Sequence, residues 1–259
     1  MRLAQARVGD GGTAVILLHG FLGSGRNLGS LARAWAARDS NLSIVMCDLR
    51  GHGDSPPLAE GADLGALGRD VLDTAAALAT EPPLRLVGHS LGGRVALAAA
   101  HAAPGRVGSV TLLDIAPGPI EESRGENGAL LASLLAAPAA APDRRTVRGA
   151  IAAAGVSPAL ADWLVMNLVR RGDGYAWRVD RAALAALRAR TDAEDLWPVV
   201  EARPAGLSVR CIRGARSPYV TAADAARFAA AGCRVDTIPD AGHLLHVDQP
   251  DRLLGLLTG

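Results

Sequence analysis

The sequence predicts an α/β fold whose mostly parallel sheet is flanked by helices and whose regular alternation is interrupted once by an inserted segment. Two observations predict the sheet. Short apolar runs without polar alternation recur along the chain, and helix-like segments separate them. Such strands are buried on both faces, which is typical of parallel sheets covered by helices. The alternation stops between residues 118 and 200, and this predicts the insertion.

The elements follow in order along the chain. Four predicted strands span 15–18, 42–47, 84–87 and 107–113, with helices at 27–37 and 64–79 and a further helix that runs into Ala103. After the insertion, strands at 209–212 and 234–238 enclose a helix at 222–231, and the last helix spans 250–257. We therefore expect a core made of residues 1–117 and 201–259.

The insertion, residues 118–200, has several helical patterns and no clear strand. The helices are predicted at 129–136, 144–154, 158–170 and 181–188. The insertion follows the strand that ends at Asp114, so we expect a helical cap over the carboxyl ends of the strands. Open α/β sheets place their binding sites at that edge.

Composition excludes several classes of function. The net charge of +1 gives no electrostatic reason to bind nucleic acid or an anionic membrane. All 27 basic residues are arginine, which excludes Schiff-base chemistry on lysine. No apolar run is long enough to span a membrane. Residues 1–10 lack the apolar stretch of a secretory signal, so a cytoplasmic protein is expected.

The cysteines and the spacing of polar residues predict neither a metal site nor a bound cofactor. Cys47, Cys211 and Cys233 are widely separated, and the first two lie in strand-like runs. Small buried cysteines of this kind are more often core residues than disulfide partners or ligands. No cluster of histidine, cysteine and acidic residues has the spacing of metal ligands.

The pentapeptide from Gly88 to Gly92 has the pattern G-x-S-x-G, with Ser90 at its centre. A predicted strand precedes it and a predicted helix follows it. A serine at such a strand-to-helix turn is held in a strained elbow that exposes its hydroxyl. The flanking glycines are needed because the backbones approach closely at the turn. Ser90 is therefore predicted to be a nucleophile.

A serine hydroxyl needs a general base at neutral pH. His243 lies in a short turn after the last predicted strand and before the last helix, and a histidine near the C-terminus fits the order serine-then-histidine. His246 is a rival, but its place in the entering helix favours packing. His101, at the end of a helix, is predicted to lie at the surface.

The loop that follows the first predicted strand reads His19-Gly20-Phe21-Leu22-Gly23. The backbone amides of Phe21 and of Leu91, the residue after the nucleophile, are predicted to form an oxyanion hole. His19 is interpreted as a structural hydrogen-bonding residue. His89 is expected to point away from the nucleophile or to line the floor of the pocket.

A third loop, residues 48–55, follows the second predicted strand. We interpret it as a rigid turn in which Asp48 and Arg50 tie the loop together, in preference to a substrate role for His52. Short loops of this kind are commonly held by side-chain hydrogen bonds to the backbone.

Together the four motifs resemble the α/β-hydrolase superfamily over essentially the whole chain. They begin at His19, Asp48, Gly88 and Gly242. A closer resemblance is to the bacterial esterase branch related to the mitochondrial abhydrolase-domain protein eleven. Further segments support it: Leu113-Asp114-Ile115-Ala116-Pro117, Arg213-Gly214 with Ser217-Pro218-Tyr219-Val220, Trp163 to Leu168, and Tyr175 to Val179. The resemblance implies an α/β-hydrolase fold and activity on short- and medium-chain acyl esters, and in some members thioesters.

The sequence departs from the common pattern of the superfamily at the acid of the triad. The loop after the strand ending at Ile212 usually carries an aspartate, but here it has no carboxylate before Asp224. Some members draw the acid from the strand that follows the nucleophile, which assigns Asp114. A carboxylate is needed to hold the tautomer of His243. The alternatives are that Asp114 only caps a turn, that Asp224 is the acid, or that there is none.

Together, the assigned residues and the resemblance predict a serine hydrolase for carboxylic esters, possibly thioesters, of small or medium acyl chains. It would act through an acyl-enzyme on Ser90. Residues assigned to the substrate pocket are Leu22, His89, Leu130, Leu134, Trp163, Met166, Tyr219 and Leu244. The four from the insertion are expected to line an acyl channel or to form the insertion's own small core. The alternatives are a carbon–carbon bond hydrolase, an enol-lactonase or a cofactor-free perhydrolase on the same triad, and a non-catalytic ligand-binding protein.

Overall fold

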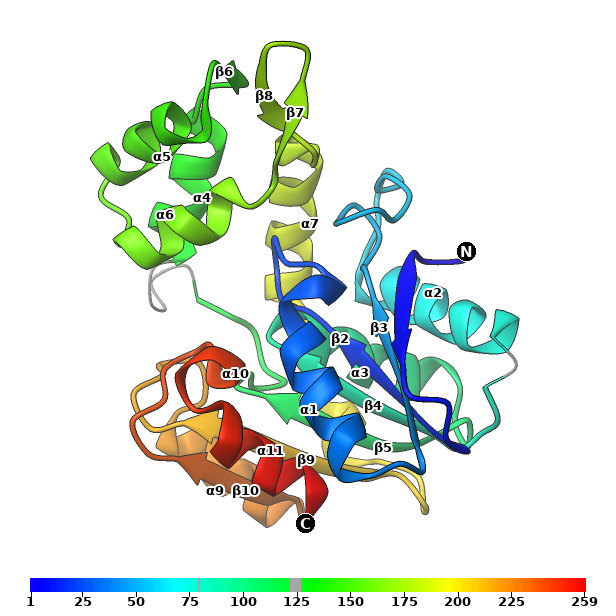
Figure 1. Cartoon of the computed structure of the whole chain (residues 1–259). Helices are drawn as coiled ribbons and strands as arrows, with labels where there is room; N and C mark the ends of the chain where they lie inside the picture. Colours follow the sequence, from blue (N-terminus) through cyan, green and yellow to red (C-terminus); the bar gives the residue numbers. More distant parts are fainter. Residues whose placement is uncertain (79, 122–126) are drawn as a thin grey trace.

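A seven-stranded, mostly parallel sheet forms the centre of the chain in the computed structural model, which describes residues 1–78, 80–121 and 127–259 (Figure 1). Its strands are β1 (Gln5–Val8), β2 (Thr13–Leu18), β3 (Leu42–Cys47), β4 (Leu84–His89), β5 (Val107–Leu113), β9 (Ser208–Gly214) and β10 (Arg234–Ile238). The order across the sheet is β1-β3-β2-β4-β5-β9-β10, and only β1 runs antiparallel to its neighbour. Every strand predicted outside the insertion is present.

Helices cover both faces of the sheet, as predicted. They are α1 (Gly29–Arg38) after the 3-10 turn η1 (Gly25–Leu28), α2 (Leu64–Ala77), α3 (Leu91–Ala102), α8 (Trp197–Glu201), α9 (Ala222–Ala230), α10 (Leu245–Asp248) and α11 (Pro250–Thr258). Two buried clusters fill the space between helices and sheet. One joins α1 and α11 to the sheet, and the other joins α2, α3 and α9 to the opposite face.

The sequence did not indicate β1, because its four residues are half-exposed or exposed and contain no apolar run. It gains its place by pairing with β3 along the edge of the sheet, from Gln5 opposite Cys47 to Val8 opposite Ile44. Backbone hydrogen bonds hold such an edge strand without a buried face.

The insertion is not wholly helical, which corrects the prediction. Its helices are α4 (Asn127–Ala136), α5 (Arg144–Ala153), α6 (Pro158–Val165) and α7 (Arg181–Ala193), and a small antiparallel sheet joins β6 (Ala140–Ala141), β8 (Gly174–Trp177) and β7 (Leu168–Arg171). The helix predicted at 158–170 ends at Val165. A hairpin follows because Gly172 takes a left-handed φ of 56° in the turn between β7 and β8.

Arg94 of α3 ties the insertion to the core. Its guanidinium is almost completely buried, and it donates to backbone carbonyls on both segments that connect the insertion to the sheet. The acceptors at the N-terminal end of the insertion are the carbonyls of Ala116, Pro117 and Gly118. Those at its C-terminal end are the carbonyls of Thr191 and Glu194. Burial lowers the pKa of Arg94 to about 10, which leaves the group charged at neutral pH. One side chain thus anchors both ends of the insertion.

Arg94→Met should destabilise the fold, because it leaves several carbonyls without their donor at the base of the insertion. Losing hydrogen bonds from a charged donor, with acceptors left unpaired, costs about 2–4 kcal/mol. Urea unfolding measures the change. Arg38→Met, at the exposed end of α1, is the matched control and should stay within about 0.5 kcal/mol of the parent. Equal effects of the two substitutions would contradict the anchoring role.

Candidate active site

Ser90 lies at the sharp turn between β4 and α3, with φ 51° and ψ −118°. A non-glycine residue rarely takes a positive φ, so the surrounding structure must hold it there. The neighbouring glycines permit the turn. A Cβ on Gly88 would lie 2.2 Å from the carbonyl of Gly92, and a Cβ on Gly92 would lie 2.4 Å from the carbonyl oxygen of Leu18. The predicted elbow is therefore present in the backbone.

His243 and Asp114 are in direct contact. Nδ1 of the imidazole lies 2.7 Å from Oδ2 of the carboxylate. Asp114 follows β5, which pairs with β4, and His243 lies in the loop after β10, so parallel strands deliver both side chains to one edge of the sheet. The Asp114 side chain is fully buried, whereas that of His243 is 25% exposed. The imidazole therefore has one end fixed and the other end accessible.

Asp224, the rival acid, lies elsewhere. Its carboxylate accepts hydrogen bonds from the backbone and hydroxyl of Thr221, and it caps the first turn of α9. The residue is half-exposed. The structure thus brings Asp114, and not Asp224, to the ring of His243.

Ser90 and His243 line the same cavity, which has a volume of about 390 Å³. No hydrogen bond joins the Ser90 hydroxyl to the free ring nitrogen of His243 in the described part of the chain. Contacts of this kind are often loose in an unliganded site and tighten when substrate is bound.

The amides of Phe21 and Leu91, the predicted oxyanion-hole donors, make no backbone hydrogen bond among the described residues. His19 shapes the loop that carries Phe21. Its Nδ1 donates to the carbonyl of Gly20 at 2.7 Å, and its Nε2 accepts from the amide of Leu49 at 2.9 Å. Burial lowers the pKa of His19 to about 4, so the ring is neutral and acts as a structural bridge.

His89 packs against His243, and His246 packs against His89. The ring centroid of His89 lies 4.6 Å from that of His243, and His89 Nε2 donates to the backbone carbonyl of His243 at 2.8 Å. Burial lowers the pKa of His89 well below its usual value and that of His246 to about 4. Both rings are therefore neutral, and within the described ranges neither of them hydrogen-bonds to Asp114.

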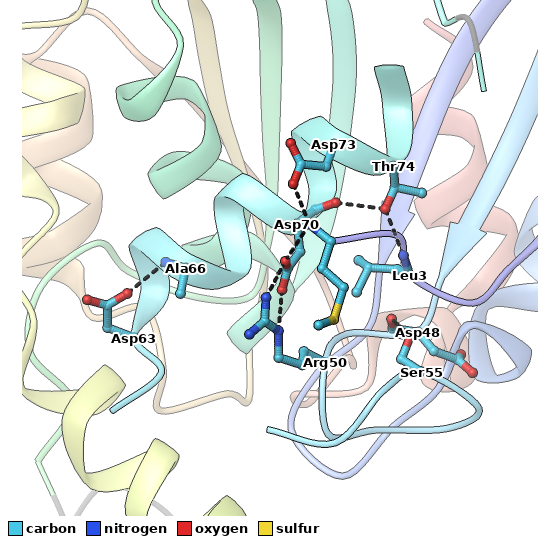
Figure 2. A network of polar contacts seen from close by, with 10 residues as sticks. Leu3, Asp48, Arg50, Ser55, Asp63, Ala66, Asp70, Asp73 and Thr74 are labelled. Atoms are coloured by element: carbon cyan, nitrogen blue, oxygen red, sulfur yellow. Dashed lines mark hydrogen bonds and ion pairs between the residues drawn. The ribbon is translucent and has the colours of Figure 1, made fainter. Parts of the chain in front are cut away.

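The loop after β3 is a rigid turn, as interpreted from its sequence. Oδ1 and Oδ2 of Asp48 accept from the amides of Gly25 and Asp54. Arg50 does not bind Asp48; it pairs with Asp70 of α2 and ties the loop to that helix, as Figure 2 shows. His52 is buried and does not line the cavity, and burial lowers its pKa to about 3.

Five of the eight residues assigned to the substrate pocket line the cavity: His89, Leu130, Trp163, Tyr219 and Leu244. The other three do not. Leu22 and Leu134 are buried in the apolar core, and Met166 is 50% exposed. Of the four insertion residues, Leu130 and Trp163 line the cavity, Leu134 lies in the core, and Met166 matches neither expectation.

The insertion supplies several lining residues that the sequence did not single out. They are Ser157, Ala159, Leu160 and Arg188. Helical spacing could have found Leu160, which lies one turn before Trp163 on α6. Arg188 of α7 packs its guanidinium 5.0 Å from the centre of the Phe21 ring and pairs with Asp192. Its place on the cavity could not be predicted from the sequence, because nothing there indicates that α7 contacts the loop that carries Phe21.

The chain belongs to the alpha/beta hydrolase family, which matches residues 15–256. It is 28% identical to the sn-1-specific diacylglycerol lipase ABHD11 of Mus musculus, over 95% of this chain and 80% of that protein. It is 27% identical to esterase Rv0045c of Mycobacterium tuberculosis, over 99% and 85% of the two chains. A solved marine microorganism esterase shares the fold, with a TM-score of 0.87, 24% identity and coverage of 99% and 98%.

The predicted α/β-hydrolase fold and the resemblance to the ABHD11-related esterases are therefore confirmed, and the chain is a hydrolase of that superfamily. Across the described ranges, no group of three or more histidine, cysteine or acidic residues could hold a metal ion. None of the described helices is both long and apolar enough to cross a bilayer.

The buried histidines predict that stability falls as the pH falls. In the folded chain the pKa of His19 and His246 is about 4, and that of His52 about 3. In the unfolded chain each takes up a proton near pH 6.5, roughly the reference value. Below that pH the unfolded state binds more protons, so the free energy of unfolding should drop by up to about 1.4 kcal/mol per pH unit for each histidine.

Urea unfolding at about pH 7 and about pH 5 tests this, since the window lies between the folded and unfolded pKa values. His101→Gln is the control, because that histidine is exposed at the end of α3. It should leave the slope unchanged. A free energy of unfolding that stays constant over the window would show that the buried rings are charged in the folded state.

Proposed function

We propose that the chain is a serine hydrolase of carboxylic esters, with Ser90 as nucleophile, His243 as general base and Asp114 as the acid that orients it. The observation that carries the proposal is the 2.7 Å contact between His243 Nδ1 and Asp114 Oδ2, beside a serine held at positive φ on the same cavity. Two relatives of the chain are named as a lipase and an esterase, and this supports an ester as the bond cleaved.

In this mechanism the Ser90 hydroxyl attacks the acyl carbonyl and His243 Nε2 takes its proton. The amides of Phe21 and Leu91 donate to the oxyanion of the tetrahedral intermediate. His243 then gives the proton to the departing alcohol, which leaves the acyl group on Ser90. In the second half of the reaction, His243 takes a proton from a water molecule, which attacks the acyl group. His243 then returns the proton to Ser90, and the acid product leaves. The buried carboxylate of Asp114 stabilises the imidazolium that forms at each step.

The insertion, residues 118–200, acts in this proposal as a cap that binds the acyl chain. Its contribution to the cavity is mainly apolar, from Leu130, Ala159, Leu160 and Trp163. The volume of about 390 Å³ suits a small or medium acyl chain. A thioester would react by the same steps, because its carbonyl and leaving group occupy the same places.

The same triad could serve a carbon–carbon bond hydrolase, an enol-lactonase or a perhydrolase. A different kind of alternative is a protein with this fold that binds a ligand without catalysing a reaction. The apolar cap wall favours an acyl ester over these. A fluorophosphonate probe separates a catalyst from a binder, because only an activated serine reacts with it.

Ser90→Ala should abolish labelling by the probe and lower kcat by about 10⁶-fold on the best ester, since removal of one triad member removes the function of the whole unit. His243→Ala should have nearly the same effect, and the double variant little more. A screen of 4-nitrophenyl esters measures it. Ser30→Ala, on the exposed face of α1, is the control and should hydrolyse at the parent rate. Ser90→Ala protein that keeps a tenth of the activity would refute the serine mechanism.

Trp163→Ala and Leu160→Ala should shift the preference toward longer acyl chains, because each shortens a side chain of the cavity wall and so enlarges the cavity. One methylene in an apolar pocket is worth about 1–3 kcal/mol, so the ratio of kcat/KM for decanoate to butyrate esters should rise at least several-fold. Met166→Ala, next to α6 but outside the cavity lining, is the matched control. An unchanged ratio in both cavity variants would show that the insertion does not set chain length.

A further inference from the structure

The loop that carries Phe21 is a tight turn that lies directly against the nucleophile. The amide of Gly23 donates to the carbonyl of Gly20 at 3.0 Å and closes the turn. A Cβ on Gly20 would lie 3.3 Å from the Cβ of Ser90. Leu22 takes a left-handed φ of 59° at the second central position of the turn, where such a φ normally requires glycine or asparagine. The turn therefore needs contacts from outside to keep its shape.

Asn167 of the insertion supplies one of these contacts. Its Nδ2 donates to the carbonyl of Leu22 at 2.8 Å, and across the described ranges this carbonyl has no other donor. The same nitrogen lies 3.5 Å from the carbonyl of Leu164. Because carbonyls only accept, both neighbours require the amide nitrogen, and not the amide oxygen, to face them. Asn167 is 7% exposed, so water has little access to replace its hydrogen bond.

Asn167 is itself held in place by the backbone of the insertion, between α6 and β7. Its amide donates to the carbonyl of Leu164 at 3.1 Å, and its carbonyl accepts from the amide of Arg178 at 2.8 Å. The guanidinium of Arg178 pairs with Asp54, in the loop after β3, at 3.0 Å. A fixed segment of the insertion thus presents the Nδ2 donor to the turn.

We propose that Asn167 is a positioning residue for the oxyanion hole, because its hydrogen bond to Leu22 holds the turn in the shape that presents the amide of Phe21. The inference rests on the proposed function, in which that amide donates to the oxyanion. His19 holds the other side of the turn. Its Nδ1 donates to the carbonyl of Gly20, which belongs to the same planar peptide group as the Phe21 amide. The insertion then acts on the reacting carbonyl through a loop of the core, besides lining the cavity.

Asn167→Asp and Asn167→Ala both remove the donor, the first with little change of shape. Each should lower kcat on the best ester by about 10- to 100-fold while KM stays within about twofold, because the Phe21 amide is displaced and not deleted. Trp177→Phe is the matched control. Trp177 Nε1 also donates to a backbone carbonyl, that of Pro138, but this bond lies within the insertion and away from the cavity lining. The control should keep the parent kcat.

An alkyl trifluoromethyl ketone gives a readout that reports on the oxyanion. When it binds, the Ser90 oxygen bonds to the ketone carbon, the serine proton passes to Nε2 of His243, and the carbonyl π electrons become the lone pair of an oxyanion. Ki for the ketone should rise in the Asn167 variants by the factor by which kcat falls. The matching secondary alcohol has no carbonyl for the serine to attack, so its Ki should not change.

The outcomes separate the two levels of the argument. Parent values of kcat and of the ketone Ki in a folded Asn167 variant would overturn the positioning role, and so would an equal loss of affinity for ketone and alcohol. A parent chain that hydrolyses no ester and binds the ketone no more tightly than the alcohol would instead overturn the proposed function. Circular dichroism identifies the folded variants. Since the aspartate and alanine substitutions remove the same donor, either one decides the test.

Discussion

The hydrogen bonds of Arg94 are the constraint on which the placement of the site depends. Arg94 lies one turn into α3, the helix that Ser90 precedes, so its guanidinium is carried by the same backbone segment as Ser90. It binds carbonyls at both ends of the insertion. The C-terminal end of α7 is thereby held against α3 of the core, and Arg188, one turn earlier on α7, contacts the ring of Phe21. Ser90, the insertion and the loop that carries Phe21 are thus mechanically connected.

Backbone strain is concentrated at one edge of the sheet. The non-glycine residues with left-handed φ in the described ranges are Leu22, Ser90, Asp114 and Asp240. Each lies in the loop that directly follows a strand, after β2, β4, β5 and β10 respectively. Such conformations cost about 1–3 kcal/mol each and persist only when the surroundings impose them. Here the packed parallel sheet imposes them where side chains must converge above the carboxyl ends of its strands.

The sequence predicted the core well because apolar runs and helical spacing report burial directly. It predicted the contact between Asp114 and His243 only through a resemblance, since nothing local distinguishes an acid from a turn cap. It missed the small sheet of the insertion, whose strands of two to four residues carry no periodic signal. It also placed Leu134 on the cavity and omitted Leu160. Both are leucines on helices, and only tertiary packing decides which face of a helix meets the cavity.

The histidines around the site show why burial and catalysis are compatible here. The proposed reaction requires a positive charge to form on His243, and a positively charged neighbour would oppose it. His89 and His246 lie beside it, and the charge of His243 contributes to the lowering of the pKa of each. Desolvation is nevertheless the larger cause in both cases, so both rings are already neutral before His243 is protonated. In the proposed mechanism, the imidazolium of His243 therefore forms against the neutral ring of His89 and beside the buried carboxylate of Asp114, which attracts it.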